Sequence, residues 1–497
     1  MFTLPSPAPE GFLFASAVGR FEELSVMSEF AEMDFTRTQT PAPVAASPWA
    51  AEARELIKLA LPLVVTQLAQ MAIMTTDVVM LGRLGKTALA GAALGNTVFF
   101  LTWLLGFGTT AAVSPMIAHI LGANPNNRAG VRAVVRMGLW SVLLLSMPLA
   151  IVLLFTKDLL VVLGQQPALA EAAGRFTLPL CVGLPFSLGY QVLRNYATAL
   201  GRPRAALWVM VVTIAFNAVA DYALIFGHFG MPRLELFGSG VATASSFTFC
   251  FLAMLLVVHL TPALRKYRIH RRFHRPDRTK FAELFRLGMP IGLTTIFEAM
   301  LFNTATLLMG TFGTATVAAH QVAMNVASIT FMVPLGVAMA ATVRVGLAAG
   351  AGDHPGVRRA GYTALAVSTC FMSVAAVILV VFRYRIAGLY FAADSPANAD
   401  VLALAALFLQ VAAAFQVMDG LQVTAALSLR GLKDARMPMW IAGGSYWLAG
   451  FPVCIWLGVG LGMKGLGVWI GLAFALMLAA IFLCWRFHYL SRDRTGG

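Results

Sequence analysis

The chain contains few charged residues. Asp, Glu, Lys and Arg make up 12% of its 497 residues, whereas hydrophobic residues make up 59%. Soluble globular domains carry about 25% charged residues, so a composition this poor in charge excludes one. Apolar segments recur along the whole sequence, and most are about 20 residues long, the length that a helix needs to cross a bilayer. The sequence therefore predicts an all-α polytopic membrane protein.

Cysteines and catalytic motifs are also scarce. The sequence has five cysteines, no CxxC pair, and no Walker A, HExxH or GxSxG motif. Without a Walker A motif the chain is not a pump with its own ATPase, and nothing predicts an enzyme or a bound cofactor. All the cysteines lie within predicted spans, where we expect small apolar residues rather than disulfides or metal ligands.

Twelve segments are predicted to span the membrane: 57–81, 88–113, 131–155, 173–193, 205–227, 238–260, 286–310, 316–342, 359–382, 401–428, 437–459 and 464–486. We expect an N-terminal six-helix lobe over residues 51–260 and a C-terminal six-helix lobe over 286–490. A basic loop over 261–285 joins them. Residues 1–50, rich in Pro, Ala and Ser, are predicted to be a poorly ordered extension, and residues 491–497 a tail.

Positive charges are distributed unevenly around these spans. Of the 36 Lys and Arg, 28 fall with the tails and the even-numbered loops and eight on the other side. This is the positive-inside pattern, and it predicts a multi-pass protein of the cell (inner) membrane with both termini cytoplasmic. The net charge of +14 is therefore a topology signal, and no nucleic-acid partner is expected. We expect the densest basic segment, residues 265–280, to anchor the topology by touching anionic lipid.

The sequence also repeats itself. Residues 56–122, moved forward by 228 positions, align with residues 284–350 without a gap, and thirteen of 67 positions are identical. The identical pairs include Leu59 with Leu287, Pro62 with Pro290, Gly82 with Gly310, Gly85 with Gly313, Gly108 with Gly336 and Gly122 with Gly350. Each unit holds six spans, an even number, so both copies begin on the same side. A parallel repeat of this kind predicts a substrate site at the interface between the halves.

Four acidic residues lie inside predicted spans: Asp77, Asp221, Glu298 and Asp419. A carboxylate at the bilayer centre costs about 2.5–3.5 kcal/mol on insertion scales, so such residues usually face a cavity, a partner or an ion path. Asn217 lies four residues before Asp221, which places both on one helix face. Their amide and carboxylate oxygens suit Na⁺, and a carboxylate can alternatively hold a proton. The acids therefore predict ion-coupled transport.

Five segments together resemble the multidrug and toxic compound extrusion (MATE) family, in its NorM-like branch: LPLVVTQLAQMAIMTTDVVMLGRLG, NYATALGRPRAAL, NAVADYALIFG, EAMLFNTATLLMG and FQVMDGLQVTAALSLRGLKDARMPM. The resemblance runs from about residue 50 to 490. It implies twelve helices in two lobes around a central cleft, within a lipid bilayer. It also implies export of small organic cations in exchange for Na⁺ or H⁺, and we expect a monomer to function.

The resemblance implies an ion site in the N-terminal half. MATE proteins use an acid of the first helix with an Asn and an acid of the fifth, which match Asp77, Asn217 and Asp221. A Thr early in the sixth helix matches Thr243. These four residues supply oxygens for Na⁺, or a carboxylate for a proton.

A second group is implied in the C-terminal half. NorM-like proteins carry acids that match Glu298 and Asp419, and these acids, with Asp77, are expected in the substrate cleft. Some NorM proteins have Tyr four residues before the second of these acids, where this chain has Phe415. Because Phe415 has no hydroxyl, cation coordination by that position is not expected, and the ring is predicted to line the cleft.

Other polar or helix-breaking residues have simpler explanations. Pro62 and Pro290 mark a helix start or a kink, and a kink at Pro62 would let the first helix bend when Asp77 changes charge. His119 and His320 are expected to be packing or interfacial residues rather than proton relays.

Two other functions remain open from the sequence. A lipid-linked oligosaccharide or lipid flippase of related two-lobe architecture would carry a cationic cleft, whereas the charges that the sequence places in the membrane are acidic. A membrane-embedded acyl or glycosyl transferase would need polar catalytic loops, and the loops here are short.

Overall fold

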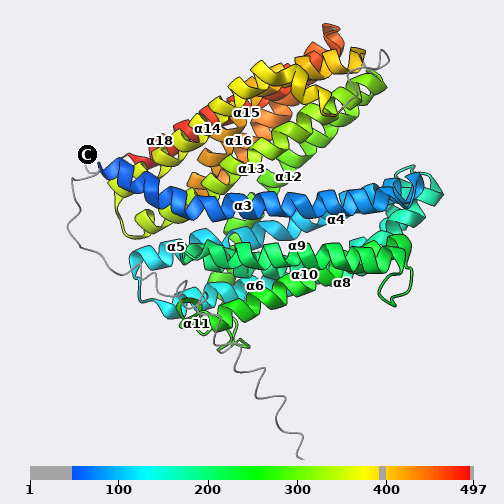
Figure 1. Ribbon diagram of the computed structural model, residues 1–497. Helices are drawn as coiled ribbons and strands as arrows, with labels where there is room; N and C mark the ends of the chain where they lie inside the picture. Colours follow the sequence, from blue (N-terminus) through cyan, green and yellow to red (C-terminus); the bar gives the residue numbers. More distant parts are fainter. Residues whose placement is uncertain (1–46, 272, 391–398, 493–497) are drawn as a thin grey trace, which may run out of the picture.

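The computed structural model describes residues 47–271, 273–390 and 399–492, which form helices joined by short loops, without a strand (Figure 1). The first half contains α3 (Pro48–Gly82), α4 (Lys86–Ala111), α5 (Val113–Ala123), α6 (Arg128–Leu154), α7 (Thr156–Val162), α8 (Pro167–Ala199), α9 (Pro203–Phe226), α10 (Glu235–Leu260) and α11 (Pro262–Arg265). The second half contains α12 (Arg278–Gly310), α13 (Thr314–Gly350), α14 (His354–Gly388), α15 (Ala399–Gly431), α16 (Arg436–Gly443), η3 (Gly444–Gly450), α17 (Phe451–Ile455), η4 (Trp456–Gly460) and α18 (Lys464–Ser491).

Twelve helices in the described ranges are long and apolar enough to cross a membrane, which confirms the predicted spans. The second span combines α4 and α5, and the eleventh runs from α16 to η4. Most helices extend beyond the predicted ends, because their first and last turns carry polar residues that a hydropathy window excludes.

The fourth span of each half lies at the centre of its lobe. α8 packs against α4, α6 and α10, and α15 packs against α13, α14 and α18. The mean hydropathy of α8 is 1.4, against 2.3 for α6 in the same lobe and 2.2 for α15 in the other. A helix surrounded by other helices can bury polar side chains that a lipid-facing helix cannot.

The first helix of each half also packs against the other half. Leu56, Leu59 and Leu63 of α3 form a buried cluster with residues of α13. The residues 228 positions later on α12, Leu284, Leu287 and Ile291, belong to the apolar core of the N-terminal lobe. The start of the first helix of each lobe therefore packs against the other lobe.

Glycines let the two lobes approach closely along this junction. A Cβ on Gly122 would overlap the carbonyl oxygen of Leu347, and a Cβ on Gly350 would overlap that of His119. These two contacts are related by the same 228-residue shift, so the repeat in the sequence is also a repeat in the packing. Small residues at such crossings allow the helix backbones to touch.

The two bundles lie together at the end where α3 begins and α18 ends, and they separate toward the opposite end (Figure 1). The close inter-lobe contacts lie in the first half of α3 and α12, in the last turns of α4 and α5, and in the second half of α13. The protein is thus closed at one end.

Two predicted boundaries differ from the structure. α3 begins at Pro48, before the predicted lobe start at 51, because Ser47 caps its first turn by accepting from Ala50 N. The basic loop ends at 277 rather than 285, because Asp277 caps α12 by accepting from Lys280 N at 3.0 Å. The rest of the predicted extension, 1–46, and the tail from 493 lie outside the described residues.

Candidate functional site

The first candidate cluster lies where α3 packs against α9. Asn217 and Asp221 are 0% exposed and stand one turn apart on α9. The Asp77 carboxylate from α3 lies close enough to interact with both side chains. The structure therefore brings together three of the four residues predicted for the N-terminal ion site.

Several buried polar atoms of this cluster make no hydrogen bond of good geometry. Asp77 Oδ1, both carboxylate oxygens of Asp221 and both polar atoms of the Asn217 amide are buried without one in the described part of the chain. Burying unpaired polar groups is costly, and two neighbouring carboxylates cannot both remain charged without a cation or a proton between them. The donor set, two carboxylates and an amide oxygen, fits either Na⁺ or H⁺.

Thr243, the fourth residue predicted for this site, is less closely connected to the other three. It lies on α10, which packs against α9, and its hydroxyl donates to the Ser239 carbonyl of its own helix at 3.0 Å. Among the described residues, no hydrogen bond joins it to the acids. Its oxygen still has a free lone pair, so its part in an ion site stays a prediction.

A second cluster lies in the C-terminal lobe. Glu298 of α12 and Asp419 of α15 interact electrostatically. Arg430 of α15 and Tyr446 of η3 also lie close enough to Glu298 to interact with it electrostatically. Asp419 Oδ1 and the Tyr446 hydroxyl are buried without a hydrogen-bond partner in the ranges that the structure describes. The predicted pair of acids is therefore present, together with a cation and a phenol that the sequence reasoning missed.

Tyr446 lies on a π-helical segment. η3 interrupts the eleventh span, and π-helical turns inside α-helices are frequent at functional sites. Its equivalent in the first half, α9, is an uninterrupted α-helix. The only sequence signal was the Gly-rich stretch around GGSYWLAG, and hydrophobic periodicity cannot reveal a wider helical turn.

A cavity of about 330 Å³ lies between the lobes. It is lined by Met71 of α3, by Phe302, Asn303 and Thr306 of α12, and by Gln321, Met324, Asn325 and Ser328 of α13. Asp77, Glu298 and Asp419, predicted for the cleft, are not among its lining residues. Phe415 does not line it either. That ring is buried behind Phe302, at 5.9 Å between ring centroids, and packs on Trp469.

The family profile MatE matches residues 62–223 and again 290–456, which is one match for each half of the chain. The chain belongs to the MatE family. This MatE chain is a multi-pass membrane transporter and not an enzyme.

The relatives of this MatE chain are similar over most of its length. A Mesorhizobium japonicum protein, "Probable multidrug resistance protein NorM", is 44% identical over 90% of this chain and 95% of its own length. A protein of the same description from Brucella suis is 40% identical over 89% of this chain and 94% of its own. The solved structure of the eukaryotic MATE transporter AtDTX14 has the same fold, with a TM-score of 0.78 at 22% identity, over 90% of this chain and 99% of that one.

The MatE chain also buries a cation that sequence reasoning missed. Arg194 of α8 lies at the lobe junction, where Nη1 donates to Gln70 and Gln191 at 3.4 Å each and Nη2 donates to Gln67. Nη2 also reaches Met339 Sδ on α13 at 3.7 Å. The sequence had suggested that the charges in the membrane are acidic, and Arg194 corrects this. It was overlooked because it falls just after the predicted end of span 4.

The remaining singled-out residues make contacts within or between helices. His320 is fully buried, with Nε2 3.0 Å from Thr306 Oγ1. His119 Nε2 lies 2.9 Å from the Gly431 carbonyl, across the lobe junction. Pro62 lies well inside α3 and not at its start, and Thr66 donates to the Pro62 carbonyl at 2.7 Å.

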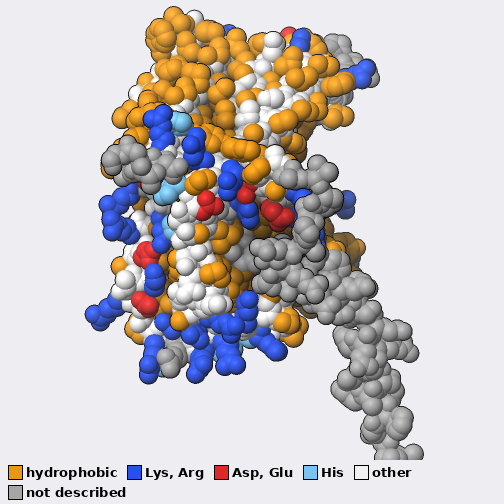
Figure 2. Space-filling view, turned by 90° about the vertical axis from the view of Figure 1, so that its left-hand side faces the viewer, with side chains coloured by type: hydrophobic (Ala, Val, Ile, Leu, Met, Phe, Trp, Pro, Cys, Tyr) orange, Lys and Arg blue, Asp and Glu red, His pale blue; other side chains and the backbone are white. Residues whose placement is uncertain are grey.

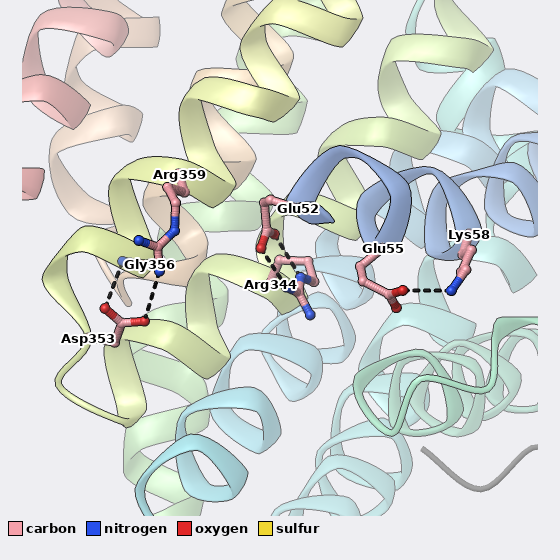
Figure 3. Close-up of polar contacts among 7 residues, drawn as sticks. All are labelled: Glu52, Glu55, Lys58, Arg344, Asp353, Gly356 and Arg359. Atoms are coloured by element: carbon pink, nitrogen blue, oxygen red, sulfur yellow. Dashed lines mark hydrogen bonds and ion pairs between the residues drawn. The ribbon is translucent and has the colours of Figure 1, made fainter. Parts of the chain in front are cut away.

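An ion pair joins the lobes at their closed end. Glu52 in the first turns of α3 faces Arg344 near the end of α13 (Figure 3). On the same helix the Glu55–Lys58 pair points away from the junction and is more exposed (Figure 3). Only the first of these pairs has to break if the lobes separate at this end.

Proposed function

We propose that the protein is a secondary active multidrug efflux antiporter that exports small organic cations in exchange for Na⁺ or H⁺. The observation that carries this proposal is the buried cluster of Asp77, Asn217 and Asp221, whose oxygens lack partners in the described residues. The printed names of the relatives, which refer to multidrug resistance, support drug export as the class of transport.

The side to which the described state opens is inferred from the charge asymmetry. The positive-inside rule puts both termini in the cytoplasm of a cell that exports across its inner membrane. Because the lobes meet at the end where α3 begins and α18 ends, this arrangement corresponds to an outward-facing state. In that state the ion cluster would exchange with the outside of the cell.

In the proposed cycle, the charge of the bound ion controls which conformation the two lobes adopt. An external cation or proton binds between Asp77 and Asp221, and its positive charge offsets two neighbouring carboxylates. A ligand shifts a conformational equilibrium only by binding the two states with different affinity. We infer that the bound ion favours the outward-facing state, in which the drug leaves. Loss of the ion to the cytoplasm restores the negative charge that attracts the next cationic drug.

Drug binding is assigned to the cavity between the lobes. Its volume of about 330 Å³ is at the lower end of the range for small-molecule sites. Met71, Met324 and Phe302 give it an apolar wall, and methionine side chains adapt readily to ligands of different shape. Asn303, Gln321 and Asn325 add amides that can donate or accept hydrogen bonds. Such a wall suits several unrelated organic cations better than one defined substrate.

The flippase alternative requires cations in the cavity between the lobes that are available to a pyrophosphate group. Arg194 is buried at the junction, but its guanidinium already donates to three glutamine side chains. Arg430 stands beside Glu298 and is partly neutralised by it. Neither cation is placed to hold a phosphate in the cavity, so the antiporter remains the better proposal.

The experiment that separates these functions uses purified protein in liposomes. Ethidium movement is followed by its fluorescence, and movement of a fluorescent phospholipid across the bilayer is followed by its reduction with an impermeant reagent. The proposal predicts ethidium transport without faster lipid movement. Faster lipid movement without ethidium transport would instead make the protein a flippase.

A further inference from the structure

A second cavity in the described residues lies outside the ion clusters. It has a volume of about 880 Å³ and opens at the end of the N-terminal lobe that carries α11. Its lining residues are Arg128, Arg132, Pro262, Arg265, Lys266, Tyr267, Arg268, His270 and Arg271. Lys and Arg gather along the lower edge of this face of the molecule (Figure 2). The cavity is lined by six permanent cations and by no acid.

The loop that forms this cavity is anchored to the lobe. Leu264, Tyr267 and Ile269 are buried in the core of the N-terminal lobe. The Tyr196 hydroxyl donates to the Leu264 carbonyl at 2.7 Å, and the Tyr196 and Tyr267 rings pack edge to face at 6.1 Å. A loop held in this way keeps its cations at fixed positions. A solvated basic tail would not show this anchoring.

Four arginines of the cavity are not paired with an acidic side chain. Within the described residues, Arg128, Arg265, Arg268 and Arg271 make no salt bridge with an acid. Burial raises the pKa of the Tyr267 hydroxyl, which therefore remains protonated and able to donate a hydrogen bond. Arginine forks and a neutral phenol are suitable donors for phosphate oxygens.

The walls of the cavity continue into surfaces that face lipid. On α6, Arg132 is followed by the exposed Trp140 and Leu144 at helical spacing on one face. The Trp140 indole donates to the Phe273 carbonyl of the loop at 3.0 Å, as is common for a tryptophan at a membrane interface. On α10, Leu256 and Leu260 are exposed just before the loop begins.

We propose that this cavity binds the phosphate headgroup of an anionic phospholipid of the inner leaflet. The arginines and Tyr267 hold the phosphate, and the acyl chains run along the exposed apolar faces of α6 and α10. Basic pockets beside transmembrane helices on the cytoplasmic side are known to bind such headgroups. The assignment of the lipid to the inner leaflet rests on the proposed topology. The lipid site itself does not depend on which drug is transported or on which ion is coupled.

The test counts lipids bound to the full-length protein by native mass spectrometry in detergent. Phosphatidylglycerol is the probe, phosphatidylcholine is the zwitterionic control, and inorganic phosphate tests whether the headgroup chemistry alone suffices. The variant R128Q/R265Q/R271Q removes three charges from the cavity. The matched control R204Q/R358Q/R436Q removes three exposed arginines that do not line it.

The proposal predicts that phosphatidylglycerol binds more tightly than phosphatidylcholine, and that millimolar inorganic phosphate does not displace it. Each charge near the membrane surface contributes about fivefold in affinity, so the cavity variant should bind on the order of a hundredfold more weakly and the control variant as wild type does. Equal weakening in both variants would mean diffuse attraction and overturn the site. Displacement by inorganic phosphate would overturn the lipid as its ligand.

A second readout separates lost binding from misfolding. Phosphatidylglycerol should raise the melting temperature of the wild type and of the control variant, because a ligand that binds only the folded state stabilises it. The cavity variant should melt at the same temperature as wild type without lipid and gain nothing from phosphatidylglycerol. A cavity variant that is stabilised as much as wild type would contradict the proposal.

Discussion

The Arg344 guanidinium holds the Glu52 carboxylate by two hydrogen bonds, from Nε to Oε1 at 2.8 Å and from Nη2 to Oε2 at 2.5 Å. The two residues belong to different lobes and to helices whose contacts close one end of the protein (Figure 3). The Glu52 side chain is only 11% exposed, so this pair is better shielded from solvent than an ordinary surface pair. Any state that opens this end has to lose the pair.

Glu52→Gln should therefore shift the protein away from the state described here. A hydrogen bond to a charged group contributes about 1.5–3 kcal/mol, which corresponds to a change in population of at least tenfold. Spin labels at Met231→Cys and Leu389→Cys, in a background without the native cysteines, report the distance between the lobes at the opposite end. We expect shorter distances to become more populated.

The matched control for this change is Glu55→Gln. Glu55 lies one turn further along the same helix and pairs with Lys58 at 2.6 Å, but both side chains are exposed. An exposed pair of this kind contributes about 0–1 kcal/mol, so the distance distribution should stay that of the parent. If both variants behave alike, the Glu52–Arg344 pair does not hold the lobes together.

Gly350→Ala should destabilise the same junction by steric overlap. A Cβ at this position would overlap the His119 backbone, so the two helices would have to move apart. Overpacking of this kind typically costs about 1–3 kcal/mol, and the melting temperature should fall accordingly. Gly310→Ala is the control, since no atom lies within 4 Å of its Cβ position. A Gly350→Ala protein as stable as the control would show that the lobes do not meet as described.

Asp77→Asn should abolish drug efflux while leaving the folded protein in the membrane. The amide has nearly the shape of the carboxylate but carries no charge for a cation or a proton to balance. Ethidium efflux from vesicles measures the effect, and Asp158→Asn, on the exposed face of α7, controls for loss of an acid as such. Efflux near the wild-type rate would remove Asp77 from the coupling mechanism.

The proposed topology predicts which loops face outward. Thr279 lies in the first turn of α12 and Met231 lies in the loop between α9 and α10, and both are exposed. Each is replaced by cysteine in a background that lacks the five native cysteines and is treated with an impermeant thiol reagent in intact cells. Met231→Cys should be labelled and Thr279→Cys protected. The opposite labelling would reverse the assigned orientation.

The sequence predicted the spans and the repeat well because both depend on hydrophobicity and spacing. The six identical pairs named from the 228-residue shift included Gly122 with Gly350, and these two glycines make equivalent contacts across the junction. The pairing of Asp77 with Asn217 and Asp221 also followed, from the resemblance and from the helical spacing of the last two. Hydrophobicity and residue spacing can be predicted from each segment of the sequence by itself.

The rest depended on packing between segments. Tyr446 joins Glu298 and Asp419 only because η3 adopts wider turns, and no periodicity in the sequence marks such turns. Phe415 was expected in the cleft, but the ring is buried between Phe302 and Trp469, since the core of α15 faces α18 there. Which face of a nearly uniform apolar helix meets which neighbour cannot be derived from its composition.

The most direct test of antiport compares two gradients in proteoliposomes that contain the purified protein. Ethidium efflux is measured with an imposed Na⁺ gradient and, separately, with an imposed pH gradient, for the wild type, for Asp77→Asn and for Asn217→Ala. The antiporter proposal predicts that at least one gradient drives efflux and that Asp77→Asn abolishes this drive. If Na⁺ is the coupling ion, Asn217→Ala abolishes it as well, whereas proton coupling survives that change. Efflux that responds to neither gradient would contradict antiport and favour the flippase.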